Sequence, residues 1–300
     1  MAIPGPGTAI SMTTIATEFG GTVPHSLSEY YRGGGLVPNS PINAAVPTSG
    51  QIAIGDFYGA TNRVAIPLTL STNSFNYDVY TNRGPTYSAG ISDITVTVNP
   101  GITVGSTSAP TYSLLVPSAF NPGDTVTIIN NGLIQAMGGA GGRGGNYPAG
   151  PGSPGSVGGN AVYINRPTTI TNNGTIAGGG GGGGGGAHFV GAKGQQPAAG
   201  GGGGGGAGTN GGAGGAAGSV VPGVQSASAG SPGTSPAGGG GGPAPRGNNG
   251  GAGGGRGAAG SAGVTDGPRP GGSGGGAGNY IVGNPFVTWP ATGTRQGGVA

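Results

Sequence analysis

The stretch TTITNNGTIAGGGGGGGGG at residues 168–186 joins the two patterns that decide the fold. Its first half is rich in β-branched residues and reaches Asn172-Asn173-Gly174, which is typical of a short strand followed by a tight turn. Its second half is unbroken glycine. A similar stretch, VTIINNGLIQAMGGAGG, stands at residues 126–142. The repeat predicts short β units with Asn-Asn-Gly turns of positive φ, from which glycine segments are suspended.

Glycine makes up 80 of the 300 residues, and 64 of these lie after residue 137. Collagen is excluded because glycine is not confined to every third position in 178–186 and 200–206. A flexible linker remains an alternative. A linker does not need the hydrophobic segments that separate the tracts, however, such as 188–190. We therefore expect a bundle of polyglycine-II helices, in which backbone hydrogen bonds between helices replace a hydrophobic core.

The composition changes along the chain and predicts three domains. Residues 1–62 contain short apolar segments ending in an acidic residue, an aromatic residue and glycine, and we expect a small docking domain of short helices and strands. Residues 63–137 contain β-rich runs separated by turn signals, which favour a sandwich or β-roll. Residues 138–300 hold the glycine tracts. The predicted fold class is mainly β with non-regular structure, comprising a docking domain, a β-sandwich-like middle and a polyglycine-II bundle on short β units.

The expected strands of the middle region are defined by β-branched or aromatic residues. They are Val64–Leu70, Phe75–Tyr80, Ile94–Val98, Tyr112–Val116 and Thr125–Ile129.

The sequence gives no pattern for catalysis, a metal or a cofactor. Cysteine is absent, and the only histidines, His25 and His188, are far apart in sequence. The carboxylates are scattered, without a local pair suited to glycoside hydrolysis. The start of the chain does not resemble a secretory signal, and no apolar run is long enough to cross a membrane. Two Arg-Gly segments are too poor in arginine to predict nucleic-acid binding. We therefore expect neither an enzyme nor a membrane-inserted protein.

Several segments resemble tailed-phage tail fibre and tail-tip proteins. The pattern TEFGG at 17–21, SLSEYY at 26–31 and GDFYGA at 55–60 resembles the opening of such proteins. The Asn-Asn-Gly units with glycine tracts, and the ending IVGN at 281–284 with VTW at 287–289, resemble T-even-type fibre-tip adhesins. The resemblance implies a virion protein, made in the host cytoplasm, whose loops between glycine helices bind outer-membrane protein or lipopolysaccharide.

Carried onto this chain, the resemblance places receptor-binding loops at 146–157, 188–197, 220–236, 243–249 and 264–270. Aromatic and basic residues dominate binding hot spots. The candidate contacts are therefore Tyr147, His188, Phe189, Lys193, Arg246 and Arg269. Residues 138–300 carry a formal charge of +6, against −3 for residues 1–137, which suits an anionic partner.

The resemblance also implies partners, and two alternative functions compete with receptor binding. The N-terminal domain would attach to tail or baseplate proteins, and the chain would form a homo-oligomer, as phage fibres are commonly trimers. A purely structural tail component, without receptor contact, is the main alternative. A secreted glycine-rich protein, such as an ice-binding protein, is a third.

Overall fold

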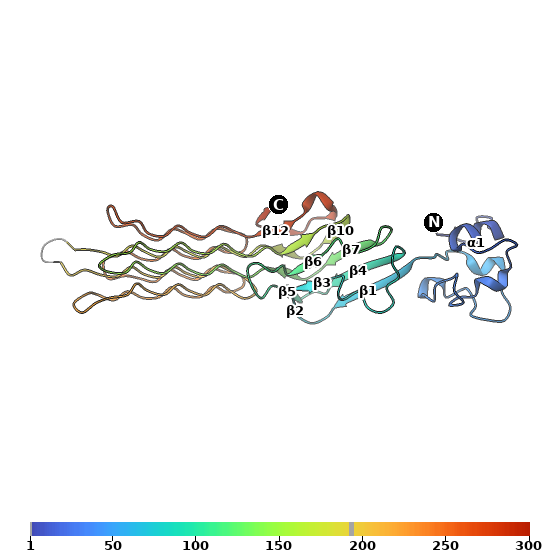
Figure 1. Cartoon of the computed structure of the whole chain (residues 1–300), viewed down its shortest axis with the longest axis horizontal. Helices are drawn as coiled ribbons and strands as arrows, with labels where there is room; N and C mark the ends of the chain where they lie inside the picture. The colour runs from blue at the N-terminus through green and yellow to red at the C-terminus, as the bar shows by residue number, and fades with distance from the viewer. Residues whose placement is uncertain (1, 192–194) are drawn as a thin grey trace. The chain divides into compact units, whose positions relative to one another are not determined.

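The computed structural model describes residues 2–191 and 195–300. The chain forms two compact units (Figure 1). The first comprises Met1–Leu68, Arg83–Thr95 and Phe120–Val126, and the second comprises Thr69–Asn82, Val96–Ala119 and Thr127–Ala300. Both units therefore combine segments that are distant in sequence.

The first unit contains short helices in residues 1–62, as expected. Helix α1, Met12–Phe19, begins after Ser11, whose hydroxyl accepts a hydrogen bond from the Thr14 N–H at 3.3 Å. Three 3₁₀ helices follow: η1 Leu27–Tyr30, η2 Pro41–Asn43 and η3 Ile54–Phe57. Within described residues 2–62, strand-like pairing is limited to the isolated bridge Arg32↔Val37, so the strands expected there are not found.

Side chains from these helices form a small core. Ile15, Tyr30 and Phe57 are fully buried, and the rings of Tyr30 and Phe57 meet edge to face at 6.2 Å. The Tyr30 hydroxyl donates a hydrogen bond to the Gly20 carbonyl oxygen at 2.7 Å, which satisfies its polar end. Each such side chain stabilises the fold by about 1.5–3 kcal/mol through burial.

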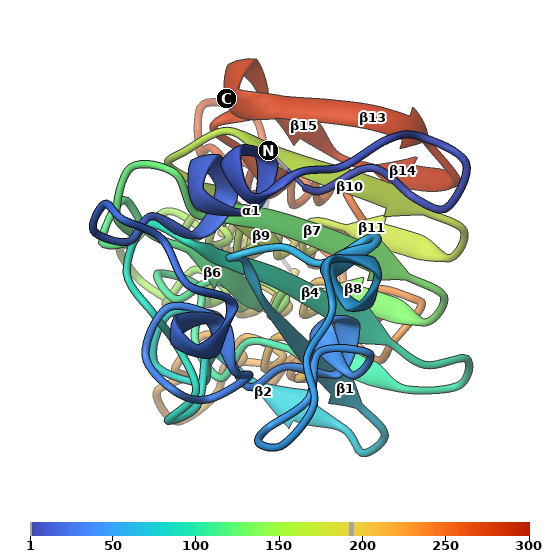
Figure 2. The ribbon, with the colours of Figure 1, turned by 90° about the vertical axis from the view of Figure 1, so that its right-hand side faces the viewer.

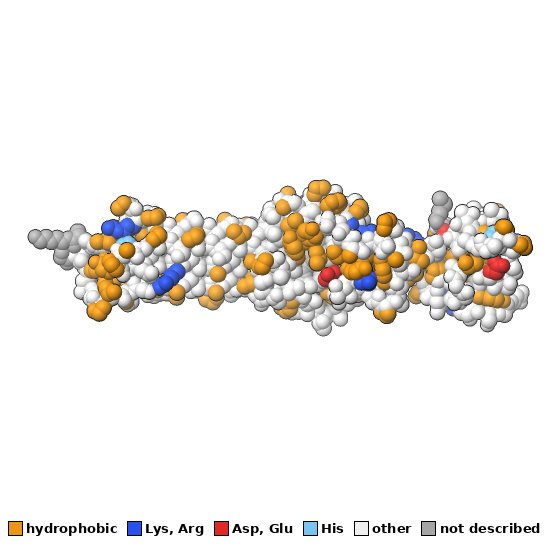
Figure 3. Space-filling model, in the orientation of Figure 1, with side chains coloured by type: hydrophobic (Ala, Val, Ile, Leu, Met, Phe, Trp, Pro, Cys, Tyr) orange, Lys and Arg blue, Asp and Glu red, His pale blue; other side chains and the backbone are white. Residues whose placement is uncertain are grey.

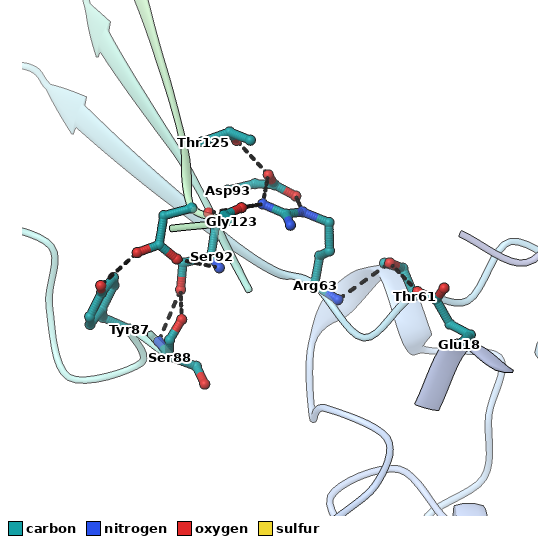
Figure 4. A network of polar contacts seen from close by, with 10 residues as sticks. Glu18, Thr61, Arg63, Tyr87, Ser88, Ser92, Asp93, Gly123 and Thr125 are labelled. Carbon is teal, nitrogen blue, oxygen red and sulfur yellow. Dashed lines mark hydrogen bonds and ion pairs between the residues drawn. The ribbon is translucent and has the colours of Figure 1, made fainter. Parts of the chain in front are cut away.

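A polar network lies within the first unit (Figure 4). Arg63 forms a two-pronged pair with Asp93, through Nε at 2.7 Å and Nη2 at 2.6 Å, and it also donates to the Gly123 carbonyl oxygen. The Thr125 hydroxyl donates to Asp93. Burial raises the pKa of Asp93, but the hydrogen bonds from Arg63 and Thr125 outweigh it and lower the pKa below its ordinary value. The carboxylate is therefore held in its charged form.

The described strands form three five-stranded sheets. The first contains β1 Val64–Leu70, β4 Ser92–Val98, β7 Thr125–Asn130, β10 Thr168–Asn172 and β13 Val287–Ala291. The second contains β2 Ser74–Phe75, β5 Thr103–Gly105, β8 Leu133–Gln135, β11 Thr175–Ala177 and β14 Thr294–Gln296. The third contains β3 Tyr77–Asp78, β6 Leu114–Val116, β9 Val162–Ile164, β12 Asn279–Val282 and β15 Gly298–Val299. A short helix, η4 Asn284–Phe286, precedes β13.

The order of the strands shows a three-sided solenoid. Neighbours within each sheet are three strands apart in sequence, for example β5, β8 and β11. Figure 2 shows the same order in another sheet, where β4, β7 and β10 lie side by side. Strands β5, β8 and β11 pair in parallel, as do β6, β9 and β12. The chain therefore visits each sheet once per turn, and every turn stacks on the previous one.

The middle of the chain is thus not the expected β-sandwich. The predicted strand positions are largely correct, but the single strand expected at Phe75–Tyr80 is two short strands, β2 and β3, in different sheets. Strand β5 has no counterpart in the prediction. A sandwich packs two mainly antiparallel sheets, whereas here consecutive strands enter different sheets. The difference arises because Asn130-Asn131-Gly132 turns a corner between β7 and β8 and does not reverse the chain.

The two Asn-Asn-Gly units lie on successive turns. Strand β10 pairs with β7 so that Asn172 lies beside Asn130, and β11 pairs with β8 so that Ile176 lies beside Ile134. The expected positive φ is wrong, because neither Gly132 nor Gly174 has one. Glycine is required for space: a Cβ on Gly174 would lie 2.1 Å from the Gly132 carbonyl oxygen.

Columns of aliphatic side chains fill the solenoid. Residues alternate in and out along β10, whose inward Ile170 is fully buried. Ile170 lies beside Ile128 of the preceding turn, and Ile134 lies between Val104 and Ile176. Register repeated from turn to turn therefore gives a continuous core from very short strands.

The glycine-rich sequence enters the solenoid at one corner, between the second and third sheets. Residues 136–161 are inserted between β8 and β9, and residues 178–278 between β11 and β12. The inserted chain runs back and forth in extended segments (Figure 1). These glycine segments are 138–145, 152–159, 178–187, 199–208, 211–218, 228–234, 237–243, 249–255, 257–264 and 271–278.

Hydrogen bonds between segments repeat every three residues. Along segment 178–187, the N–H groups of Gly179, Gly182 and Gly185 donate to segment 152–159, each at 2.9 Å. The N–H groups one residue further along the chain donate to segment 199–208, and those two residues further along donate to segment 257–264. Its carbonyls accept from segments 138–145, 249–255 and 271–278. This central segment is thus bonded on all sides without a hydrophobic core.

Glycine is sterically necessary in the central segments. A Cβ on Gly182 would lie 1.9 Å from the Ala140 carbonyl oxygen, and one on Gly203 would lie 2.0 Å from that of Gly183. Segment 211–218 lies at the edge and tolerates Ala213 and Ala216, which are exposed. The unbroken glycine tracts therefore mark the segments that are surrounded by others.

Polar side chains hold the base of the glycine segments to the solenoid. The buried Gln135 side-chain oxygen accepts hydrogen bonds from Ser235 Oγ at 2.6 Å and Arg256 Nε at 3.2 Å. Thr209 Oγ1 donates to the Gln135 carbonyl oxygen at 2.6 Å. Burial lowers the pKa of Arg256.

Candidate functional site

The glycine segments are joined at the end away from the solenoid by loops, which we call the distal loops (Figure 1). They comprise residues 146–151, 188–191 with 195–198, 219–227, 244–248 and 265–270. The loops expected at 146–157 and 220–236 are shorter than predicted. Residues 152–157 and 228–234 instead belong to glycine segments, because their backbones bond to neighbouring segments.

Hydrogen bonds connect the distal loops to one another and to the segments beside them. Tyr147 N–H donates to the Ser219 carbonyl oxygen at 3.3 Å, and Ala199 N–H donates to that of Gln225 at 3.1 Å. Gly152 N–H donates to the Pro270 carbonyl oxygen at 3.2 Å. Residues far apart in sequence therefore form one loop surface.

Tyr147 and His188, two candidate residues, contact each other. Their rings meet edge to face with centroids 6.1 Å apart. His188 is only 4% exposed, and its Nδ1 lies 2.8 Å from the Gly150 carbonyl oxygen. Tyr147 is half-buried. His188 therefore lies beneath the loop surface, in contrast to its predicted role as a direct contact.

Phe189 and Arg246 form a second pair. The Arg246 guanidinium lies over the Phe189 ring, 5.9 Å from its centroid. Phe189 is fixed by two backbone hydrogen bonds with Ala198, at 2.8 and 3.0 Å. The arrangement presents an aromatic ring and a cation together, a combination common at binding hot spots.

Arg269 lies beside Asp266 in the last distal loop. Their side chains form an ion pair at 3.6 Å, and their backbones exchange hydrogen bonds at 2.9 and 3.0 Å. Both residues line an open depression with Phe189, Val190 and Gly191. The structure therefore brings Phe189 and Arg269 to one place, although 80 positions separate them in sequence. Lys193 lies outside the described residues.

Exposed valines in or next to the loops were not among the predicted contacts. Val220 and Val221 are 40% and 46% exposed, and Val264, the last residue of segment 257–264, is 44% exposed. Hydrophobic and basic side chains gather at the distal-loop end of the glycine segments, whereas the flanks carry few large side chains (Figure 3). Aliphatic residues between glycine tracts are the sequence signal that could have identified these valines as candidate contacts.

The described residues contain no group of three or more His, Cys, Asp or Glu side chains placed to bind a metal ion. Among the same residues, no helix is long and apolar enough to span a membrane.

Comparison with known proteins gives three results. No curated protein matches the sequence. The solved structure of the gp37–gp38 adhesin tip complex of the bacteriophage S16 long tail fibre is similar, with 21% sequence identity over 100% of both chains and a TM-score of 0.49. The model of the family "Phage tail fibre adhesin Gp38" matches residues 65–300. This match covers the solenoid, the glycine segments and the distal loops, and the chain therefore belongs to the Gp38 family of phage tail fibre adhesins.

Proposed function

We propose that this adhesin binds a receptor on the bacterial surface through its distal loops. The receptor is an outer-membrane protein or lipopolysaccharide. The observation that carries the proposal is the gathering of exposed valines with the Phe189–Arg246 pair at one end of the glycine segments. Apolar patches with aromatic and arginine anchors favour binding by burial and cation–π contacts.

The glycine segments support this role by holding the loops rigidly. We infer that the segments are polyglycine-II helices, because their hydrogen bonds repeat every three residues and link different segments. Each loop is tied to bonded segments at both ends, so loop residues lose little further freedom on binding. Such preorganisation increases affinity.

Residues 1–62 would attach the adhesin to the phage tail. Support comes from their position before the family match, which begins at residue 65, and from a helical core of their own. Val23 and Ile42 are 76% and 55% exposed there and would be covered by a tail protein. The division into residues 1–62, 63–137 and 138–300, and a homotrimeric fibre, remain part of this proposal.

The test is competition for adsorption with the whole purified chain. Cells of a susceptible bacterium are incubated with the chain before phage are added. We expect the wild-type chain to bind cells and reduce phage adsorption. A variant with Phe189→Ala and Arg246→Ala should bind at least about tenfold more weakly, the effect of losing one hot spot. Ala213→Ser, on an exposed flank, is the matched control.

The outcomes separate the two functions. Wild-type binding that is lost in the double variant and retained in the control supports receptor recognition. A folded wild-type chain that neither binds cells nor competes with phage would support a purely structural tail component. Binding of the same chain to purified lipopolysaccharide or to vesicles containing outer-membrane proteins identifies the receptor class.

A further inference from the structure

His188 belongs to a distal loop yet is buried. It is 4% exposed, and its Nδ1 lies 2.8 Å from the Gly150 carbonyl oxygen. A carbonyl oxygen only accepts hydrogen bonds, so Nδ1 carries the proton and donates it. The imidazole therefore ties its own loop to the first distal loop, residues 146–151.

The other side of the first distal loop is held by Ser219. The Ser219 N–H donates to Asn146 Oδ1 at 2.7 Å, and the Tyr147 N–H donates to the Ser219 carbonyl oxygen at 3.3 Å. Arg143 also donates to the Ser219 hydroxyl. Residues 146–150 are thus held at both ends, by hydrogen bonds to Ser219 at the start and to His188 at the end.

The imidazole also packs against Tyr147, the side chain of this loop that is a candidate receptor contact. Its ring and that of Tyr147 lie 6.1 Å apart at 77°, a favourable edge-to-face geometry. Tyr147 is half-buried, so part of it remains available to a partner. His188 therefore contacts both the backbone of the loop, at Gly150, and the Tyr147 ring.

The second nitrogen of His188 has no hydrogen-bond partner among the residues that the structure describes. Nε2 is buried, and a buried polar atom without a partner lowers stability. An apolar ring would pack here without that cost. The donor at Nδ1 is thus the feature that distinguishes histidine from such a ring at this position.

We propose that His188 is a positioning residue, which acts on receptor binding through Tyr147. The inference rests on the proposed function of the distal loops. His188 contributes through the hydrogen bond that Nδ1 donates, and not through direct contact with the receptor.

Three substitutions in the full chain, carried on virions, separate the donor from general packing. In His188→Asn the side-chain nitrogen lies near the position of Nδ1, whereas in His188→Gln it lies near that of Nε2. His188→Phe keeps an aromatic ring without any donor and removes the unpartnered nitrogen. The adsorption rate constant on a susceptible strain and the Tm of each purified chain are measured.

We expect His188→Asn to adsorb within about twofold of wild type, and His188→Gln and His188→Phe about tenfold more slowly, the scale of one hydrogen bond. The Tm of His188→Phe should stay close to that of wild type, because the loss of the Nδ1 hydrogen bond opposes the gain from removing the buried Nε2. Wild-type adsorption by His188→Phe would overturn the proposal, because ring packing alone would then suffice. Equal losses in the Asn and Gln variants would also overturn it.

Tyr147→Ala separates this proposal from the proposed function. If His188 acts through Tyr147, adding His188→Phe to Tyr147→Ala lowers adsorption no further. Additive losses would overturn the positioning role while leaving receptor binding by the loops intact. If Tyr147→Ala, Phe189→Ala and Arg246→Ala all leave adsorption unchanged, the proposed function itself fails.

Discussion

Asn130 and Asn172 form a hydrogen bond between successive turns of the solenoid, with Asn130 Nδ2 donating to Asn172 Oδ1 at 2.7 Å. Both side chains are fully buried. Asn172 Nδ2 continues the ladder to the last turn, where it donates to the carbonyl oxygens of Thr292 and Thr294 at 2.8 and 3.2 Å. At this corner the backbone pairing within each sheet ends, and the asparagine side chains supply hydrogen bonds to the polar groups there.

Substitution of Asn172 should therefore destabilise the solenoid. Asn172→Ala leaves the buried Asn130 amide with fewer partners and removes the hydrogen bonds to the carbonyls of residues 292 and 294. We expect a loss of about 1–3 kcal/mol in the free energy of unfolding, measured by urea denaturation. Asn173→Ala is the control, since the Asn173 side chain is exposed and donates to Asn131 Oδ1 at 2.9 Å. Equal losses in both variants would contradict a role for the buried ladder.

A glycine in a central segment should not tolerate a methyl group. In Gly182→Ala the Cβ would lie 1.9 Å from the Ala140 carbonyl oxygen, which forces the segments apart. We expect a loss of several kcal/mol or failure to fold, seen as a lower Tm or insoluble protein. Gly240→Ala is the matched control, because nothing lies within 4 Å of its Cβ position. It should change stability by less than about 1 kcal/mol.

The Arg63–Asp93 pair should make stability depend on pH. The pKa of Asp93 is lowered below its ordinary value of 3.8. Its stabilising effect is therefore complete above about pH 4 and is lost as the pH falls through the lower, folded-state pKa. The pair is partly exposed, so we expect no more than about 1 kcal/mol. Unfolding of wild type and Asp93→Asn is compared from pH 7 to pH 2.5. A difference that persists undiminished at the acid end would contradict this origin.

Phe189 and Arg246 should act as one unit in binding. If the guanidinium is held over the ring for receptor contact, Phe189→Ala and Arg246→Ala each remove most of the shared effect. The double variant should then adsorb little worse than either single variant. Adsorption rate constants for the complete double-mutant cycle measure this coupling. Losses that multiply would show that the two side chains contribute independently.

The sequence by itself determined much of the local structure. The strands over Val64–Leu70 and Thr125–Asn130 follow from β-branched residues, and the similarity of the two Asn-Asn-Gly units predicts two equivalent β units. The glycine tracts around Gly182 and Gly203 likewise predict close packing of backbones, because a Cβ at these positions would clash with a neighbouring segment. These features are visible in the sequence because each depends on short-range pattern or on the absence of a side chain.

Only the tertiary structure decided how these parts combine. Asn130-Asn131-Gly132 is compatible with a hairpin or a corner, and the stacking of neighbouring turns selects the corner. The burial of His188 beneath Tyr147, and the meeting of Phe189 with Arg246 and Arg269, depend on which glycine segments lie side by side. Unbroken glycine distinguishes surrounded segments from edge segments, but backbone hydrogen bonds between nearly identical glycine tracts do not specify which tract lies beside which, so the tertiary structure is needed to decide it.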